Sequence, residues 1–277
     1  MRIKKNTEKD FYAGKNILIT GVSSGIGRAL SLKLVDLGAN VFGVSRNEER
    51  MCSLVKSMKD KSGKFMPFLS DISDYNNCVK ISEEIKKNFN LLDVIINNAG
   101  VGHFMPFEKM DYSDYQYLIN TNLMAPMHLT SLLLSCLKQS RAPRVINICS
   151  SGGFYGIPFR GIYCSAKAGL RVWSQALELE LARYNIMVSW VIPGATKTDF
   201  FENTLGKAPQ THRIPDKIRP PELLAEKILK FAVNRKGELF DSLSSRAVYY
   251  LANNFPGVTK IILKKMISQE ERHIYNK

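Results

Sequence analysis

Three side chains between residues 144 and 171 have the types and spacing of a proton-transfer site: Ser150, Tyr163 and Lys167. A free tyrosine titrates at about pH 10, but a neighbouring ammonium favours the phenolate and lowers that pKa. A serine hydroxyl beside the phenol could donate to the same substrate oxygen and polarise a carbonyl. The alternative for Tyr163 and Lys167 alone is an ordinary helix with a half-buried tyrosine and an exposed lysine, so the rest of the chain has to decide.

The sequence around these residues predicts a strand, a turn and a helix. An apolar, β-branched run at 145–148 is typical of a strand that is buried on both faces. Ser150 follows the end of this strand, and the glycines after it indicate a turn. From Tyr163 onward the pattern is helical, and residues four apart share one helix face. We therefore expect Tyr163 and Lys167 to lie together, opposite Ser150.

A glycine-rich turn follows the first predicted strand, residues 16–20. Its spacing is Gly-x-x-x-Gly-x-Gly, and an amphipathic helix that ends at Gly38 comes next. Glycines let the backbone approach a phosphate closely, and the start of the helix offers free N–H groups and its positive end. The turn therefore predicts a dinucleotide site with these residues: Gly21, Ser23, Ser24, Gly25, Ile26 and Gly27.

The ends of the second and third predicted strands indicate which cofactor binds. The second strand ends at Ser45 and Arg46, where an NAD-binding domain places an acidic residue against the ribose hydroxyls. A guanidinium suits a 2′-phosphate, which predicts NADP(H) rather than NAD; the alternative is a solvated arginine that begins a helix. After the third strand, Asp71 could accept from the adenine amino group beside Ile72, or it could merely cap a helix.

Two further groups of small or polar residues complete the predicted site. Small residues after the fourth strand let the backbone lie against a flat ring: Asn98, Ala99 and Gly100. A long helical pattern at 112–138 contains Asn120 and Asn122, although asparagine is not favoured inside helices. An internal asparagine can bulge the backbone or hold a water, which suits a proton relay. We assign that role to Asn122 and a surface position to Asn120.

Strands alternate with helices along the chain, which predicts an α/β protein with a doubly wound parallel sheet and helices on both faces, a Rossmann fold. We expect a single domain over residues 1–277, with an N-terminal tail at 1–15. An irregular segment at 194–220 predicts a lid over the substrate, and 242–277 predicts a helical, basic C-terminal extension. In such sheets ligands bind beyond the carboxyl ends of the strands, where every motif above lies.

Through TGVSSGIG, NNAG, YCSAK and PGATKT, the chain resembles the short-chain dehydrogenase/reductase superfamily over about residues 14–200. The resemblance implies hydride transfer between NADPH and a carbonyl or alcohol. Tyr163 would be the catalytic acid/base and Ser150 would hold the substrate oxygen. Lys167 would bind the nicotinamide ribose and lower the tyrosine pKa, and Asn122 would anchor a water that links Lys167 to solvent. The resemblance also implies contacts with the nicotinamide end of the cofactor from these residues: Pro193, Gly194, Thr196 and Thr198.

The end of the chain departs from this family pattern. Many members end with a seventh strand and a glycine-rich tail that builds a tetramer, whereas residues 236–277 predict basic helices. This difference favours a homodimer, formed through the helices near 112–138 and 161–184. Apolar residues at 258, 261, 262 and 266 recur at helical spacing beside lysines, so the last helix could lie on an anionic membrane surface. It could also pack on its own domain or on a partner subunit, which is the interpretation we favour.

Aromatic residues follow three of the motifs: Phe104 after the fourth strand, Phe154 after the catalytic serine, and Phe200 on the predicted lid. Apolar groups around one mouth predict a hydrophobic carbonyl substrate, such as a fatty acyl, sphingoid, steroid-like or aromatic ketone. The alternative is that these rings pack the loops themselves. His103 is adjacent, and we expect a lone loop histidine to be solvated.

Composition limits the classes of protein to which the chain can belong. The chain of 277 residues is 45% hydrophobic, enough for a full core, and no apolar run approaches the roughly 20 residues of a membrane-spanning helix. Its charged N-terminus lacks the apolar centre of a secretory signal. Five scattered cysteines predict reduced thiols in the cytoplasm and no metal site.

The net charge of +14 could attract anionic ligands or lipid, but no nucleic-acid module is visible. The rival to an enzyme is a catalytically lapsed NADP-binding sensor or scaffold.

Overall fold

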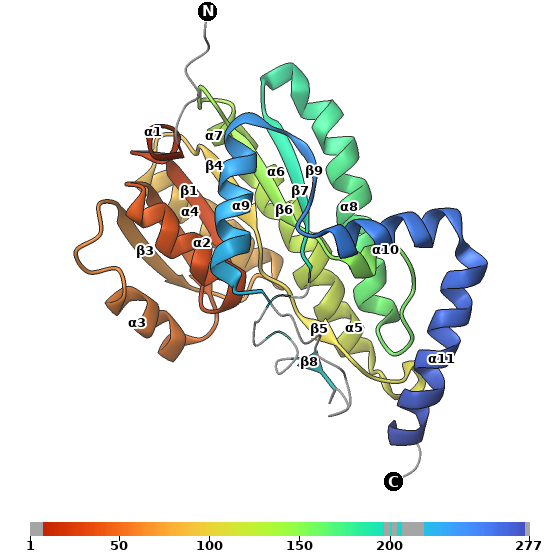
Figure 1. The fold of residues 1–277 in the computed structure, drawn as a ribbon. Coiled ribbons are helices and arrows are strands. Elements are labelled where there is room, and N and C mark those ends of the chain that lie inside the picture. Colours follow the sequence, from red (N-terminus) through yellow and green to blue (C-terminus); the bar gives the residue numbers. More distant parts are fainter. Residues whose placement is uncertain (1–7, 195, 197–199, 201–203, 207–218, 275–277) are drawn as a thin grey trace, which may run out of the picture.

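The computed structural model describes residues 8–194, 196, 200, 204–206 and 219–274, with side chains described up to Lys265. Its centre is a parallel sheet in the order β3-β2-β1-β4-β6-β7-β9 (Figure 1). In chain order these strands are β1 (Asn16–Thr20), β2 (Asn40–Ser45), β3 (Lys64–Leu69), β4 (Val94–Asn97), β6 (Arg144–Ile148), β7 (Met187–Ile192) and β9 (Gly237–Phe240). This topology confirms the predicted doubly wound parallel sheet.

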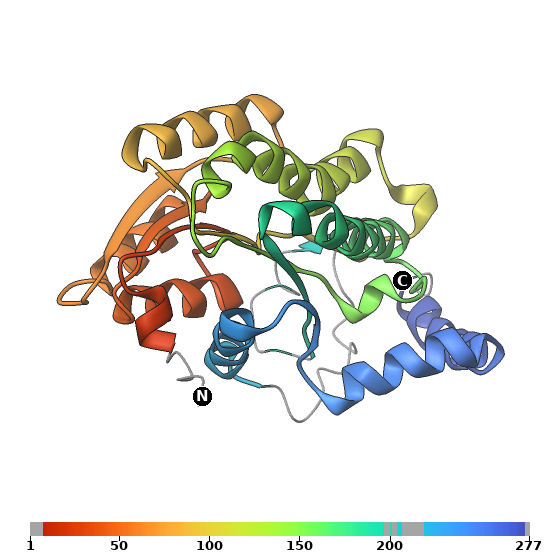
Figure 2. The same ribbon diagram turned by 90° about the horizontal axis from the view of Figure 1, so that it is seen from above.

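Helices cover both faces of the sheet, as the view from above shows (Figure 2). One face carries α1 (Glu8–Tyr12), α2 (Gly25–Asp36), α3 (Glu48–Lys56) and α9 (Pro221–Asn234). The other face carries α4 (Tyr75–Asn88), α5 (Tyr112–Ile119), α6 (Ala125–Leu132), α7 (Leu134–Leu137) and α8 (Gly161–Leu181). Alternate residues of β1 supply both cores: Ile17 and Ile19 pack with α2 and α9, and Leu18 packs with α4 and α6.

The long helical region predicted at 112–138 is one run with an irregular centre. A π-helical turn, Asn120–Met124, joins α5 to α6, so one extra residue is accommodated between them. The turn buries Asn122 completely and leaves Asn120 half-buried. Asparagine therefore occupies the point where the regular helix is interrupted.

In the core, buried polar side chains link two neighbouring strands to a helix. Asn97 of β4 donates to Asn147 of β6 at 2.8 Å, and Asn147 donates to the Ser174 hydroxyl of α8 at 2.8 Å. Because unpaired polar groups are costly inside a core, this chain of hydrogen bonds fixes the relative positions of β4, β6 and α8.

The prediction that the seventh strand is absent was wrong. The segment Gly237–Phe240 forms β9, which pairs in parallel with β7. It is only four residues long and buries Leu239, while Glu238 accepts a hydrogen bond from the indole of Trp190 at 2.9 Å. A strand this short, with a glutamate held by tertiary partners, has too few residues for a periodic signal.

The C-terminal helices are present. The helix α10 (Leu243–Asn254) begins at a capping box formed by Ser242 and Ser245, and α11 (Pro256–Ile274) follows after a break at Phe255. A small second sheet pairs β5 (Gly102–His103) with β8 (Thr204–Leu205). Short helical turns occur at Phe107–Lys109, Ser151–Gly153 and Ala182–Tyr184. Over the described ranges, none of the helices combines the length and apolar character needed to cross a membrane.

Candidate active site

The structure brings the three predicted catalytic side chains together at the carboxyl end of β6. Ser150 follows this strand and accepts a hydrogen bond from the Gly152 N–H at 3.1 Å. Its side chain is also hydrogen-bonded to that of Tyr163, which lies in the first turn of α8. One turn further along, the Lys167 ammonium donates to the carbonyl of Ile148 at 2.8 Å. The strand, the turn and the helix therefore position a hydroxyl, a phenol and an ammonium at one site.

The pKa of the tyrosine differs from the expectation. Burial raises the pKa of Tyr163 to about 12, and the hydrogen bond with Ser150 lowers it only in part. The Phe200 ring lies 5.6 Å from the Tyr163 ring, centroid to centroid, and adds to this burial. The prediction that Lys167 brings the tyrosine pKa down is therefore not met in this structure. The phenol is protonated at neutral pH, the form that a proton donor needs.

Lys167 itself is buried, with only 4% of its surface exposed. Burial lowers its pKa from 10.5 to about 8, because an ammonium with few polar partners is costly away from water. A lysine in this position carries its charge at pH 7 and loses it in mildly alkaline solution.

Asn122 uses its amide group to hold the chain that follows β4. Its Nδ2 donates to the Val101 carbonyl at 2.9 Å, and its Oδ1 accepts from the Val101 N–H at 3.0 Å. A Cβ atom added at Gly100 would lie 2.7 Å from Asn122 Oδ1 and 3.5 Å from Lys167 Nζ. Asn122 therefore lies near the lysine, and the water that it would anchor stays a prediction.

The glycine turn has the shape of a phosphate cradle. Gly21 adopts a φ of +72°, and a Cβ at Gly27 would come within 2.1 Å of the Gly21 oxygen, so only glycine fits there. The amide of Asn98 fastens the turn by donating to the Thr20 and Gly21 carbonyls, both at 3.0 Å. Ser24 stands at the N-cap of α2, but its side chain makes no capping hydrogen bond. The first N–H groups of the helix therefore suit a pyrophosphate.

The other residues predicted for this part of the cofactor site lie in the same turn or at the ends of three further strands. They are Ser23, Gly25, Ile26, Ser45, Ile72 and Ala99. Their positions at the ends of β1, β2, β3 and β4 agree with a ligand bound beyond the strands.

Arg46 stands at the end of β2 with 56% of its side chain exposed. Its guanidinium lies 3.4 Å from Asp71 Oδ2 and 5.5 Å from the centre of the Tyr117 ring. An exposed ion pair of this kind contributes little, so the arginine can exchange it for a phosphate. Asp71 also accepts from the Ser73 N–H at 2.9 Å, and its predicted contact with adenine stays a prediction. Sequence reasoning missed Tyr117, because no motif marks it and its neighbour in the structure, Arg46, is distant in the sequence.

Contacts with the nicotinamide end of the cofactor were predicted for the segment after β7, and the structure describes part of this segment. Thr196 donates to the Gly194 carbonyl at 3.1 Å, whereas Thr198 lies outside the described residues. Gly194, which follows Pro193, donates its N–H to the buried carboxylate of Asp241 at 3.3 Å. Asp241 was not predicted, because the strand that ends just before it, β9, was not recognised.

The aromatic residues predicted to line the substrate site divide into two groups. Phe200 lies against Tyr163, and Phe104 is buried with its ring 5.7 Å from Phe159. Phe154 instead stacks 4.9 Å from Tyr249 of α10 and 5.0 Å from the Arg171 guanidinium. Of the three predicted rings, Phe200 is therefore the one that the structure brings to Tyr163.

The expectation that His103 is solvated was wrong. It is 3% exposed on β5, and neither ring nitrogen has a hydrogen-bond partner among the described residues. Burial lowers its pKa, so the imidazole is neutral at pH 7. Pairing of β5 with β8 covers this residue, and such pairing between distant segments has no local sequence signal.

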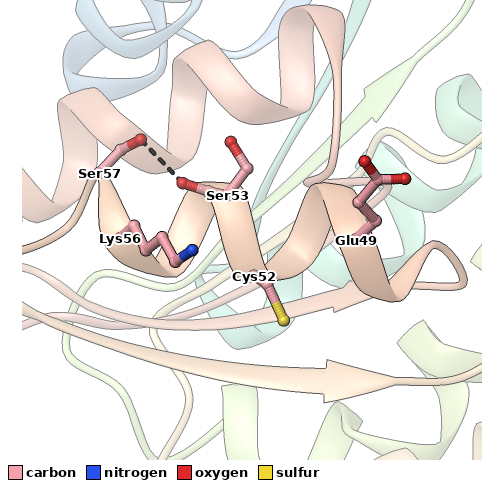
Figure 3. A pocket seen from close by; sticks show the side chains of 5 residues that line it. All are labelled: Glu49, Cys52, Ser53, Lys56 and Ser57. Carbon is pink, nitrogen blue, oxygen red and sulfur yellow. Dashed lines mark hydrogen bonds between the residues drawn. The ribbon is translucent and has the colours of Figure 1, made fainter.

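Two clefts among the described residues lie apart from these side chains. One, of about 530 Å³, follows one side of α3 and is lined by Glu49, Cys52, Ser53, Lys56 and Ser57 (Figure 3). The Ser57 hydroxyl donates to the Ser53 carbonyl at 2.9 Å, so the polar groups of this cleft partly satisfy one another. The other, of about 640 Å³, lies between α9, β9 and α10. Neither cleft is lined by the predicted catalytic residues.

Comparisons with known proteins agree with this geometry. A family model described as short chain dehydrogenase matches residues 15–208. The 3-oxoacyl-(acyl-carrier-protein) reductase FabG of Thermotoga maritima is 32% identical over 222 residues, covering 79% of this chain and 90% of that protein. A Burkholderia phymatum short chain dehydrogenase/reductase solved with NAD superposes with a TM-score of 0.81 at 18% identity, over 90% of this chain and 96% of that one. A metagenomic short-chain oxidoreductase solved with NADP gives 0.71 at 25% identity, over 84% and 99%.

Proposed function

The chain belongs to the short chain dehydrogenase family, and on that premise we propose that it is an NADP(H)-dependent reductase of hydrophobic carbonyl compounds. The observation that carries this proposal is the hydrogen bond between Ser150 and a half-buried, protonated Tyr163, with Lys167 one helical turn away. A lapsed sensor or scaffold would need no such combination of groups.

The choice of NADP(H) rests on Arg46. Its exposed guanidinium, at the end of β2, can form charge-assisted hydrogen bonds with a 2′-phosphate. The glycine cradle and the uncapped start of α2 fit a pyrophosphate in either cofactor, so they do not discriminate. Relatives are divided too, since one neighbour was solved with NAD and another with NADP.

The residues of the site perform the proton chemistry of reduction. NADPH supplies the hydride when it is bound. Ser150 donates a hydrogen bond to the carbonyl oxygen of the substrate and polarises it. Tyr163 is protonated at neutral pH, with its pKa raised to about 12, and donates its proton to that same oxygen. The phenolate that remains regains a proton from solvent, and Lys167, one helical turn along α8, would hold the nicotinamide ribose of the cofactor.

The substrate class follows from the surroundings of the tyrosine. Phe200 packs on its ring, and the buried Phe104 lies on the segment after β4. Rings in these positions favour an apolar group next to the reacting carbonyl. The Thermotoga relative, named as a 3-oxoacyl-(acyl-carrier-protein) reductase, makes fatty acyl ketones the first substrates to test.

We also propose that the protein acts as a cytoplasmic homodimer. Two apolar side chains of α8, Val172 and Leu179, are 60% and 77% exposed, and Tyr112 of α5 is 66% exposed. A partner subunit that covers these helices would remove this apolar surface from water. Sedimentation equilibrium of the wild type and of Leu179→Gln tests the assembly, since the variant is expected to dissociate more readily.

The proposed reaction is tested by following NADPH oxidation with 3-oxoacyl thioesters and with simple apolar ketones. In Tyr163→Phe we expect the rate to fall by roughly 10²- to 10⁴-fold while NADPH still binds, because only the transferred proton is lost. The matched control is Tyr75→Phe, an exposed tyrosine on α4, which should retain the wild-type rate. Equal turnover by Tyr163→Phe and the wild type would contradict the proposal.

A further inference from the structure

The last two helices expose a concentration of apolar side chains. Six large ones, each between 45% and 85% exposed, lie on α10, on α11 or at the break between them: Leu243, Tyr250, Phe255, Val258, Ile261 and Ile262. On α11, Val258, Ile261 and Ile262 follow the i, i+3, i+4 spacing that places them on one face. We call these six residues and their basic neighbours the terminal face.

The charge of the terminal face has one sign. Between Leu243 and Lys265 the chain has four basic side chains and no acidic one: Arg246, Lys260, Lys264 and Lys265. Lys260 and Lys264, both exposed, are four residues apart on α11 and lie next to Ile261 along the helix. Apolar side chains bordered by ammonium groups form the pattern of a helix that lies in the interface of a membrane.

Packing on the rest of the protein uses a different side of these helices. Tyr249 of α10 stacks on Phe154 and Phe240, and Thr259 of α11 is buried, with its hydroxyl donating to the Leu251 carbonyl of α10 at 3.3 Å. The domain therefore covers the inner side of the extension. The apolar residues of the terminal face nevertheless stay at least 45% exposed, and two of them, Leu243 and Tyr250, border the open cleft between α9, β9 and α10.

We propose that the terminal face docks the protein peripherally on the anionic surface of a lipid bilayer. The six apolar side chains would enter the headgroup region, and the basic groups would meet anionic lipid phosphates. A second copy of this positively charged face would repel it, which disfavours self-association there. In Figures 1 and 2 the two helices extend to one side of the domain, and α11 runs toward the end of the molecule where the strands terminate.

Bilayer docking stands independently of the proposed reaction, because it can be measured without cofactor or turnover. The full-length protein is sedimented with large vesicles of phosphatidylcholine containing 30% phosphatidylglycerol, chosen as about a third anionic lipid to give a strong surface potential. Neutral phosphatidylcholine vesicles form the parallel arm. We expect binding to the anionic vesicles that is much weaker in 0.5 M salt, roughly where the Debye length falls below 5 Å, and weak binding to neutral ones.

Paired variants separate the apolar contribution from the charge. Ile261→Gln with Ile262→Gln removes the apolar contact, and we expect at least tenfold weaker binding. Lys260→Gln with Lys264→Gln should weaken binding by about fivefold per lysine, since each is worth about 1 kcal/mol near an anionic surface. All four residues are exposed, so these variants should fold normally.

Controls of similar exposure lie on the opposite side of the domain. Val55→Gln with Tyr75→Gln changes two exposed side chains of α3 and α4, which are 40% and 51% exposed, and should bind vesicles like the wild type. Lys80→Gln with Lys86→Gln is the charge control on α4. The proposal is overturned if the wild type does not sediment with anionic vesicles, or if test and control variants bind equally. It is also overturned if Ile261→Gln with Ile262→Gln only dissociates a dimer, since the face would then join two copies of the chain.

Discussion

The buried charge of Lys167 makes a specific prediction about the pH dependence of stability. In the unfolded chain this lysine keeps its ordinary pKa of 10.5, whereas burial lowers the folded-state pKa to about 8. A difference of this size corresponds to about 3 kcal/mol of free energy of unfolding, at 1.36 kcal/mol per pKa unit. The native state bears this cost at pH 7, where the ammonium is buried and charged.

The direction follows from the number of protons that each state binds. Between pH 8 and pH 10.5 the unfolded state keeps the lysine proton and the native state has lost it, so the free energy of unfolding rises with pH. From pH 7 to pH 9.5 this one group contributes an increase of about 2 kcal/mol. In Lys167→Met the chain keeps a side chain of similar shape without the charge, and this increase disappears.

Urea unfolding followed by circular dichroism at pH 7, 8, 9 and 9.5 measures the effect. The difference in free energy of unfolding between the wild type and Lys167→Met isolates the lysine, because groups distant from it titrate equally in both and burial raises the pKa of Cys149, which interacts with it, to about 12. Lys230→Met, which changes an exposed lysine of α9, should give a curve parallel to that of the wild type. If the difference between wild type and Lys167→Met stays constant to within about 0.5 kcal/mol over this range, the reasoning about its buried charge is refuted.

Three further predictions concern the cofactor site. Replacing Arg46 with alanine should weaken NADPH binding by roughly 5- to 30-fold and leave NADH binding unchanged in a fluorescence titration, since charge-assisted hydrogen bonds to one phosphate are lost; equal weakening of both would contradict the assignment. Asn122→Ala should lower the free energy of unfolding by about 2–4 kcal/mol in urea, because Val101 loses partners for two buried backbone groups. Gly27→Ala should abolish NADPH binding by distorting the cradle, whereas Gly257→Ala, with nothing within 4 Å, should bind normally.

Much of the fold was predictable because its determinants are local. The run at 145–148, the glycine turn and the Tyr163–Lys167 spacing each lie within a few residues, where strand and helix periodicity can be read directly. Parallel strands then bring their carboxyl ends to one edge without any further information. The interruption at Asn122 was foreseeable for the same reason, since a residue disfavoured in helices stands inside a helical pattern.

The features that the sequence did not predict depend on contacts between distant segments of the chain. The strand β9 exists because β7 offers a free edge, and its four residues have no strand signal of their own. His103 is buried by pairing of β5 with β8, about a hundred residues apart. The raised pKa of Tyr163 results from its burial, to which the Phe200 ring contributes, and a neighbouring lysine in the sequence cannot reveal that.

These distant contacts also explain what the C-terminal extension does for the site. Asp241, directly after β9, accepts from the Gly194 N–H and so holds the segment predicted to meet the nicotinamide. Tyr249 of α10 packs on Phe154, four residues after Ser150. The extension thus contacts the carboxyl edge of the sheet at two places, once through a buried carboxylate and once through stacked rings. A chain end that contacts the predicted site in this way still leaves six apolar side chains and their lysines exposed for a different contact.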